Sequence, residues 1–181
     1  MKITPLDIPD VILLKPNLYE DERGFFYESF NQRDFIEATG ASLNFVQDNH
    51  SKSKKGVLRG LHFQRPPYDQ GKLVRVMHGA VLDVAVDLRR SSATYGEWVS
   101  VELNHENKWM YWIPPGFAHG FVTLEDNTVF FYKCTKVYNK ESEGSIYWND
   151  PDLNIDWKVD NPILSEKDMN GPSFKDFVTP F

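Results

Sequence analysis

Hydrophobic and polar positions alternate over short segments along most of this chain, and turn residues separate the segments. Runs of this kind that are rich in Val, Ile, Phe, Tyr, Trp and Thr are typical of β-strands. They predict strands at residues 11–15, 24–30, 44–51, 57–64, 72–77, 80–88, 97–103, 108–113, 120–123 and 129–135. The clearest helical signal covers residues 33–40 and ends at a glycine. About ten short strands with so little helix indicate an all-β sandwich or barrel.

Turn residues suggest how neighbouring strands connect. His78 and Gly79 separate two long apolar runs, and residues 125–127 separate two more, so both sites are predicted to be hairpin turns. From Asn149 onward the chain contains several prolines in turn-like surroundings. This C-terminal part is predicted to wrap around the outside of the barrel.

The predicted strand at residues 80–88 carries acidic residues within an apolar pattern. Its even-numbered positions from 82 to 88 are all aliphatic, whereas Asp83 and Asp87 lie on the opposite face. The favoured interpretation is that both aspartates point outward. If their face instead points into a barrel, Asp83 becomes a pocket carboxylate.

Composition narrows the class of protein. The chain has 181 residues, of which 41% are hydrophobic and 25% charged, so we expect one globular domain over residues 1–181. The sequence shows neither a membrane-spanning run nor a secretory signal, and Cys134 has no partner for an intrachain disulfide. We therefore expect a cytoplasmic protein that does not bind membranes. Its net charge of −6 argues against nucleic-acid binding but allows a phosphorylated ligand in a local basic pocket.

Two short histidine-containing segments stand out. In GVLRGLHFQ (56–64), five residues separate a glycine from His62; in IPPGFAHGF (113–121), a Pro-x-Gly precedes His119 by two residues. The first resembles the first cupin motif and the second resembles the second cupin motif. This resemblance implies a jelly-roll barrel with an interior pocket.

The first motif departs from the pattern of metal-binding cupins. Those proteins have two histidines one residue apart, a glutamate soon after, and a third histidine in the second motif. Here Gln64 takes the place of the second histidine, and no glutamate follows in range. Because transition metals usually take three or four imidazole or carboxylate ligands, we predict no metal. His62 is then either a structural histidine or a group that transfers protons near neutral pH.

Longer segments carry a more specific resemblance. They are DERGFFYESF, FVQDNHSKSKKGVLRGLHFQ, QGKLVRVMHGAVLDVAVDLR, YGEW, WIPPGFAHGF and LSEKD, in that order. Together they resemble the dTDP-4-dehydrorhamnose 3,5-epimerase family over nearly the whole chain. The resemblance implies conversion of dTDP-4-dehydro-6-deoxy-D-glucose to dTDP-4-dehydro-L-rhamnose by epimerisation at C3 and C5. It also implies that no metal or organic cofactor is needed.

The resemblance also implies catalytic roles. His62 matches the family's base, and Tyr132 matches its proton donor on the opposite face of the sugar. Asp168 is the expected partner of His62, with Asp83 as the rival. Lys72 would stabilise the oxyanion that forms at C4. From pattern alone, a core tyrosine is the favoured interpretation of Tyr132 and a solvated lysine that of Lys72, and the resemblance reverses the first.

Substrate contacts follow from the same resemblance. The implied set is Arg23, Glu28, Gln47, Asp48, Asn49, Arg59, Lys72, His119, Glu143 and Lys167, with Tyr138 stacking on thymine. Guanidinium groups bind oxyanions in a bidentate manner, so Arg23 and Arg59 are the expected diphosphate ligands. The family further implies a homodimer with exchanged N-terminal strands, in which Arg23 and Glu28 would serve the partner's pocket.

One conflict and three alternatives remain open. Strict alternation places Arg59 and His62 on opposite faces of their strand, unless the chain twists or bulges at Gly60. A related mono-epimerase or 3,4-ketoisomerase on the same fold is the nearest alternative function. A metal-dependent cupin and a non-catalytic cupin that binds sugar nucleotides are more distant ones.

Overall fold

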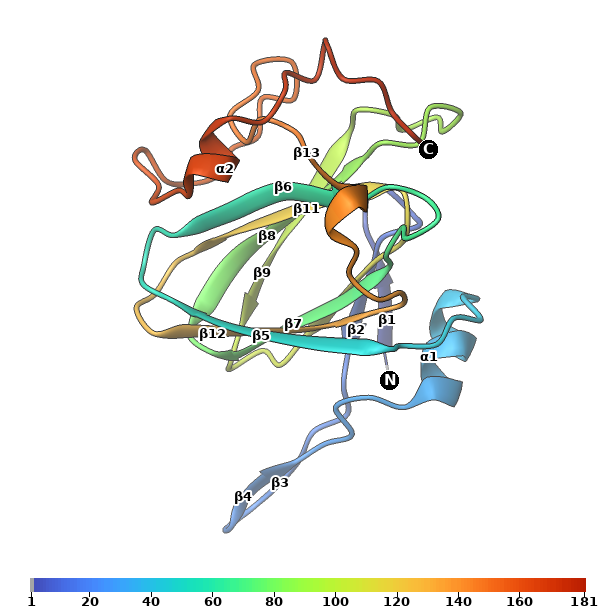
Figure 1. Ribbon diagram of the computed structural model, residues 1–181. Helices are drawn as coiled ribbons and strands as arrows, with labels where there is room; N and C mark the ends of the chain where they lie inside the picture. Colours follow the sequence, from blue (N-terminus) through green and yellow to red (C-terminus); the bar gives the residue numbers. More distant parts are fainter. Residues whose placement is uncertain (1) are drawn as a thin grey trace.

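The computed structural model describes residues 2–181, which form two β-sheets packed face to face (Figure 1). In spatial order, the first sheet contains β1 (Lys2–Pro5), β2 (Ile12–Lys15), β10 (Met110–Ile113), β7 (Lys72–His78), β12 (Thr128–Cys134) and β5 (Gln47–Ser53). The second contains β13 (Glu143–Ser145), β6 (Leu58–Gln64), β11 (Phe117–Thr123), β8 (Ala80–Asp87) and β9 (Trp98–Asn104). All neighbouring strands are antiparallel. The expected jelly-roll barrel is confirmed.

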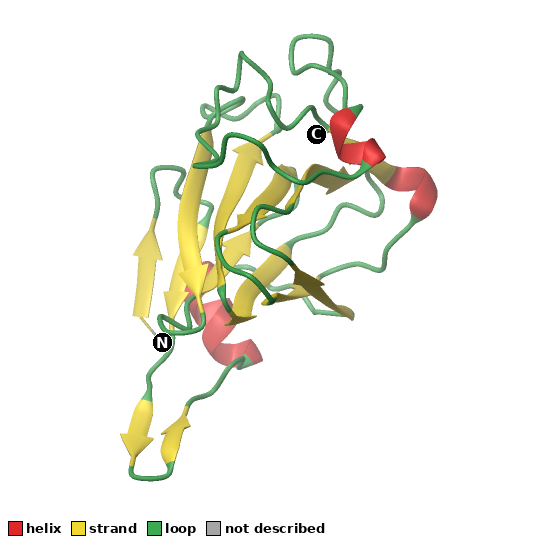
Figure 2. Cartoon of the chain, turned by 90° about the vertical axis from the view of Figure 1, so that its left-hand side faces the viewer, coloured by secondary structure: helices red, strands yellow, loops and turns green. Residues whose placement is uncertain are grey.

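Smaller elements lie around these sheets. The hairpin of β3 (Tyr19–Asp21) and β4 (Gly24–Phe26) projects away from the barrel, as Figures 1 and 2 show. Helix α1 (Gln32–Thr39) follows it, and η1 (Lys140–Ser142) and α2 (Glu166–Met169) come late in the chain. None of the helices within residues 2–181 is long and apolar enough to cross a membrane.

Two apolar cores stabilise the barrel. The first lies between the sheets and includes Val74, Val101 and Phe130. The second lies on the outer face of the second sheet, where Leu153 and Trp157 of the C-terminal part pack against the strands. The C-terminal part therefore covers the barrel from outside, which confirms the sequence prediction.

Most local predictions agree with the structure. The helix expected at 33–40 is α1, which is capped by the Asn31 side chain and ends at Gly40 in the left-handed conformation (φ 67°). The strand expected at 24–30 is too long, because β4 stops at Phe26 and the chain turns toward α1. Strands β1, β3 and β13 are three or four residues long and carry no clear alternation, so the sequence did not reveal them.

Both predicted hairpins are wrong. His78–Gly79 joins β7 to β8, and residues 125–127 join β11 to β12, but in each case the two strands belong to different sheets. The prediction of a turn at each site is confirmed, since Gly79 has φ 77° and Asn127 has φ 57°, as residues in tight turns often do. A tight turn does not require its flanking strands to pair, and here each turn passes from one sheet to the other.

The outward orientation predicted for Asp83 and Asp87 is also wrong. Both are fully buried, on the face of β8 that also contributes Val81 and Ala85 to the core between the sheets. The even-numbered aliphatic residues face the C-terminal part instead. Because both faces of β8 are covered, its alternation could not indicate which face is interior.

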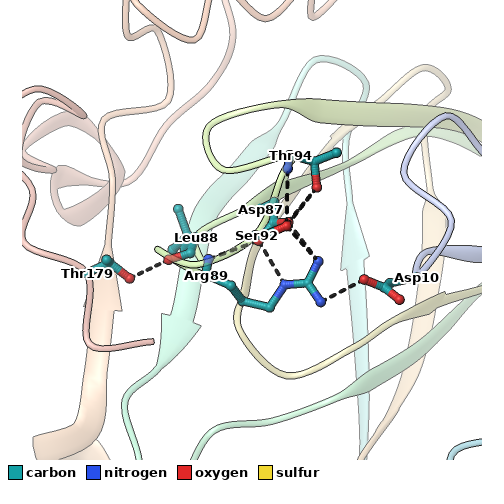
Figure 3. A network of polar contacts seen from close by, with 7 residues as sticks. All are labelled: Asp10, Asp87, Leu88, Arg89, Ser92, Thr94 and Thr179. Carbon is teal, nitrogen blue, oxygen red and sulfur yellow. Dashed lines mark hydrogen bonds and ion pairs between the residues drawn. The ribbon is translucent and has the colours of Figure 1, made fainter.

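Asp87 organises a polar network at one end of the barrel (Figure 3). Its carboxylate accepts hydrogen bonds from Arg89, Ser92 and Thr94, and Arg89 also reaches Asp10 at 2.7 Å. Burial alone would raise the pKa of Asp87, but these hydrogen bonds lower it to about 2. The network thus links the β8–β9 loop to the N-terminal part of the chain.

Candidate active site

A cavity of about 520 Å³ opens between the two sheets. His62 on β6 and His119 on β11 line it from the second sheet, while Lys72 on β7 and Tyr132 on β12 line it from the first. Residues 163–165 and 167–168 of the C-terminal part close one side. Polar groups from distant parts of the chain therefore meet in one cavity.

His62 is hydrogen-bonded to Asp168. The Nε2 atom of His62 lies 2.5 Å from Oδ1 of Asp168, and Oδ2 of Asp168 accepts the hydroxyl proton of Ser165 at 2.7 Å. Burial alone would raise the pKa of Asp168, but the hydrogen bonds from His62 and Ser165 outweigh it and lower the pKa. Asp168 is therefore an anion at neutral pH, suited to orient an imidazole and stabilise its protonated form.

A second histidine–aspartate pair lies deeper. The Nε2 atom of His119 lies 2.9 and 3.0 Å from the two carboxylate oxygens of Asp83, and both residues are buried. Burial raises the pKa of Asp83 and lowers that of His119, and the attraction between them opposes both shifts. Asp83 thus contacts His119, so the rival pairing with His62 is wrong.

Lys72 and Tyr132 are neighbours on adjacent strands of the first sheet. Nζ of Lys72 lies 5.9 Å from the centre of the Tyr132 ring. Burial lowers the pKa of Lys72, although nearby Cys134 and Asp83 oppose this effect. Burial also raises the pKa of Tyr132 to about 12, so its phenol keeps its proton at neutral pH. The cavity therefore offers a protonated acid beside a buried lysine.

A bulge explains how Arg59 and His62 both line the cavity. On β6 three residue steps separate them, whereas their partners Phe121 and His119 on β11 are two steps apart. The extra residue rotates the strand between them. Gly60 permits this because its φ is 144° and a Cβ there would lie 2.5 Å from Cα of Gly120. The conflict with strict alternation is thereby resolved.

Other predicted ligands lie in or near the cavity. Asn49 and Lys167 line it, and Lys167 forms an ion pair with Glu143 on β13. Gln47 donates to Asn49 at 3.0 Å and accepts the backbone N–H of Tyr138 at 2.8 Å. Tyr138 is about half exposed, next to this group.

Besides Gln47, Tyr138 and Glu143, three more predicted ligands do not line the cavity of their own chain. Arg23 is bonded to Asp21 in the projecting β3–β4 hairpin, and Glu28 accepts from Asn31. Asp48 forms an ion pair with Lys133, because alternation along β5 points it away from its neighbour Asn49.

Sequence reasoning missed Ser165. Its hydroxyl accepts the backbone N–H of Asp168 at 3.2 Å and so caps α2. The Ser-x-x-Asp spacing of SEKD, typical of a helix start, could have indicated this.

Within residues 2–181, no three or more His, Cys, Asp or Glu side chains gather in a way that could hold a metal ion. The fold and the cavity define a cupin-like jelly-roll protein whose interior carries a histidine–aspartate pair, a lysine and a protonated tyrosine.

Comparisons with known proteins agree with this class. The family model described as dTDP-4-dehydrorhamnose 3,5-epimerase matches residues 5–176. A dTDP-4-dehydrorhamnose 3,5-epimerase of Pseudomonas aeruginosa is 58% identical over 97% of each chain. The chain belongs to the dTDP-4-dehydrorhamnose 3,5-epimerase family, and it is an isomerase.

Solved structures show the same relationship. The crystal structure of dTDP-4-dehydrorhamnose 3,5-epimerase from Elizabethkingia anophelis superimposes with a TM-score of 0.94, at 53% identity over 97% of each chain. The crystal structure of a dTDP-6-deoxy-D-glucose-3,5-epimerase from Legionella pneumophila, in complex with dTDP-4-keto-L-rhamnose, also has a TM-score of 0.94. It is 49% identical over 98% of this chain and 94% of that one.

Proposed function

We propose that this protein epimerises C3 and C5 of dTDP-4-dehydro-6-deoxy-D-glucose to give dTDP-4-dehydro-L-rhamnose, with His62 as base and Tyr132 as acid. One observation carries the proposal. His62 and Tyr132 enter the same cavity from facing sheets, so a sugar between them presents one face to each. Epimerisation requires such an arrangement, because the proton must leave one face of a carbon and return to the other.

The chemistry follows from the C4 ketone. C3 and C5 both adjoin it, so loss of either proton leaves an enolate whose charge rests on the C4 oxygen. His62 takes the proton, and the C–H electron pair moves into the new C=C bond. Tyr132 then delivers a proton to the same carbon from the opposite face, and solvent restores both side chains. Lys72 stabilises the enolate oxygen, and Asp168 stabilises the protonated His62.

The cavity also suits a nucleotide diphosphate. The basic residues Arg59, Lys72 and Lys167 line it, with Lys167 paired to Glu143, although the chain has a net charge of −6. Arg59 is positioned by Ser53, which lies 3.2 Å from its guanidinium. Tyr138 is about half exposed, and its ring offers a flat surface for the base. We assign the diphosphate to Arg59 and the thymine to Tyr138.

The reaction is tested with dTDP-4-dehydro-6-deoxy-D-glucose in deuterated buffer. Product NMR should show inversion at both C3 and C5, with one deuterium at each. Inversion at a single carbon would indicate a mono-epimerase, and movement of the ketone to C3 would indicate a ketoisomerase. Absence of turnover would overturn the proposal.

We further propose a homodimer that exchanges its N-terminal strands. The β3–β4 hairpin exposes Tyr19, Phe25 and Phe26, and its Arg23 is not among the residues that line the cavity of its own chain. An exposed apolar hairpin is suited to contact with a second copy of the chain.

Sedimentation equilibrium should give twice the chain mass of 21.0 kDa. Mixing inactive Arg23→Ala and His62→Ala chains should restore activity in heterodimers; a monomer would exclude the exchange.

A further inference from the structure

Ser165 makes two hydrogen bonds to a single residue. Its oxygen accepts the backbone N–H of Asp168 at 3.2 Å, and its proton is donated to Oδ2 of the same residue at 2.7 Å. The other carboxylate oxygen, Oδ1, lies 2.5 Å from Nε2 of His62. Each oxygen of Asp168 therefore has its own side-chain partner, and the two partners lie on different segments of the chain.

This arrangement fixes the plane of the carboxylate. A carboxylate can rotate about its last side-chain bond, and such rotation would misalign the hydrogen bond to His62. Asp168 is buried, so water has little access to replace a lost donor at Oδ2. The Ser165 oxygen accepts the backbone amide of Asp168 while its single proton is donated to the carboxylate, so the hydroxyl has no second proton for another acceptor.

We propose that Ser165 is a positioning residue for the reaction, which acts by holding Asp168 in the orientation that aligns His62 as base. This inference rests on the proposed function, because it takes His62 to be the base. Ser165 caps α2 at the side of the cavity, and its effect on turnover is transmitted through Asp168.

The chain contains a matched control for the capping geometry. Ser173 donates to Oδ2 of Asp176 at 2.6 Å and accepts the backbone N–H of Asp176 at 3.3 Å. The sequences SEKD and SFKD thus form the same pair of hydrogen bonds. Asp176 is exposed and contacts no histidine, so Ser173→Ala removes the same bonds without affecting the cavity.

The test compares Ser165→Ala, Ser165→Thr and Ser173→Ala in the full-length chain, with dTDP-4-dehydro-6-deoxy-D-glucose as substrate. We expect Ser165→Ala to lower kcat by at least about tenfold and to change KM by less than about threefold, because alignment is lost while binding is kept. Ser165→Thr, which keeps the hydroxyl, should restore kcat. Ser173→Ala should behave as the unsubstituted protein does.

A double-mutant cycle separates positioning from helix capping. In an Asp168→Ala background, Ser165→Ala should cause no further loss of kcat, because the carboxylate that it orients is gone. An equal loss in both backgrounds would overturn the proposal, as would an unchanged kcat in Ser165→Ala alone. If thermal denaturation shows that Ser165→Ala is unfolded, Ser165→Cys keeps the volume but donates weakly, and it should lower kcat in the same way.

The outcome for His62→Ala distinguishes the two proposals. If His62→Ala retains turnover, the proposed function is wrong. If His62→Ala is inactive and Ser165→Ala is fully active, only the role of Ser165 is wrong.

Discussion

Replacing His62 with alanine is expected to reduce kcat by about 10³-fold or more, because a positioned general base contributes roughly 10²–10⁴-fold and no water can be aligned equally well. His62 is the cavity histidine that is hydrogen-bonded to a carboxylate of low pKa. Without it, the protons of C3 and C5 should stay in place. The measurement is NMR in deuterated buffer, where exchange at both carbons should disappear together.

Two further variants sharpen this test. His78→Ala removes an exposed histidine at the end of β7, outside the cavity, and should leave exchange unchanged. Asp168→Asn should keep the packing but lose the negative charge, and its kcat should fall between that of His62→Ala and that of the unsubstituted protein. Persistent exchange at C3 or C5 in His62→Ala would mean that another group takes the proton.

The contacts of His62 could be anticipated only in part from the sequence. The two histidine motifs indicated the barrel and its interior pocket, and both histidines do line the cavity. The family resemblance correctly favoured Asp168 over Asp83 as the partner of His62. Spacing alone could not do so, because more than a hundred positions separate the pair and the contact depends on how the C-terminal part folds over β6.

The errors have a common physical cause. Alternation along a strand shows which residues share a face but not what covers that face. Asp83 was therefore predicted to face solvent. In the structure the C-terminal part covers the other face of β8, and Asp83 is buried on the face between the sheets. The turn at Gly79 was likewise identified from its local chemistry, while the choice of pairing partner depended on strands far away in the sequence. Local preferences fixed the elements, and contacts between distant segments fixed their arrangement.

Distant contacts also decide which residues can serve the cavity. Alternation along β5 separates Asp48 from Asn49, and the projecting hairpin carries Arg23 away from the cavity of its own chain. A single chain therefore holds the proposed acid, base and oxyanion cation, but only some of the implied substrate ligands. The proposed strand exchange would supply others from a second copy. Substrate binding would then depend on the dimer, whereas the groups proposed for proton transfer would all come from one chain.

Replacing Tyr132 with phenylalanine should separate the two halves of the reaction. The change removes one hydroxyl and keeps the ring that packs beside Phe130. We expect epimerisation to slow by about 10²–10³-fold, the usual range for loss of a positioned acid. Exchange of the substrate protons should slow much less, because His62 can still form the enolate and return a solvent-derived deuteron to the same face. The measurement is the ratio of exchange to inversion at C3 and C5.

This ratio follows from the state of the phenol. With a pKa of about 12, Tyr132 is protonated throughout the neutral range, so it can donate but cannot serve as the resting base. Tyr95→Phe removes a hydroxyl outside the cavity and should leave both rates unchanged. If Tyr132→Phe slowed exchange and inversion equally, the phenol would be needed to form the enolate, which is incompatible with a donor that acts only after it. A raised ratio would instead mean that the enolate forms normally and lacks a proton source on its far face, where β12 places Tyr132 opposite His62.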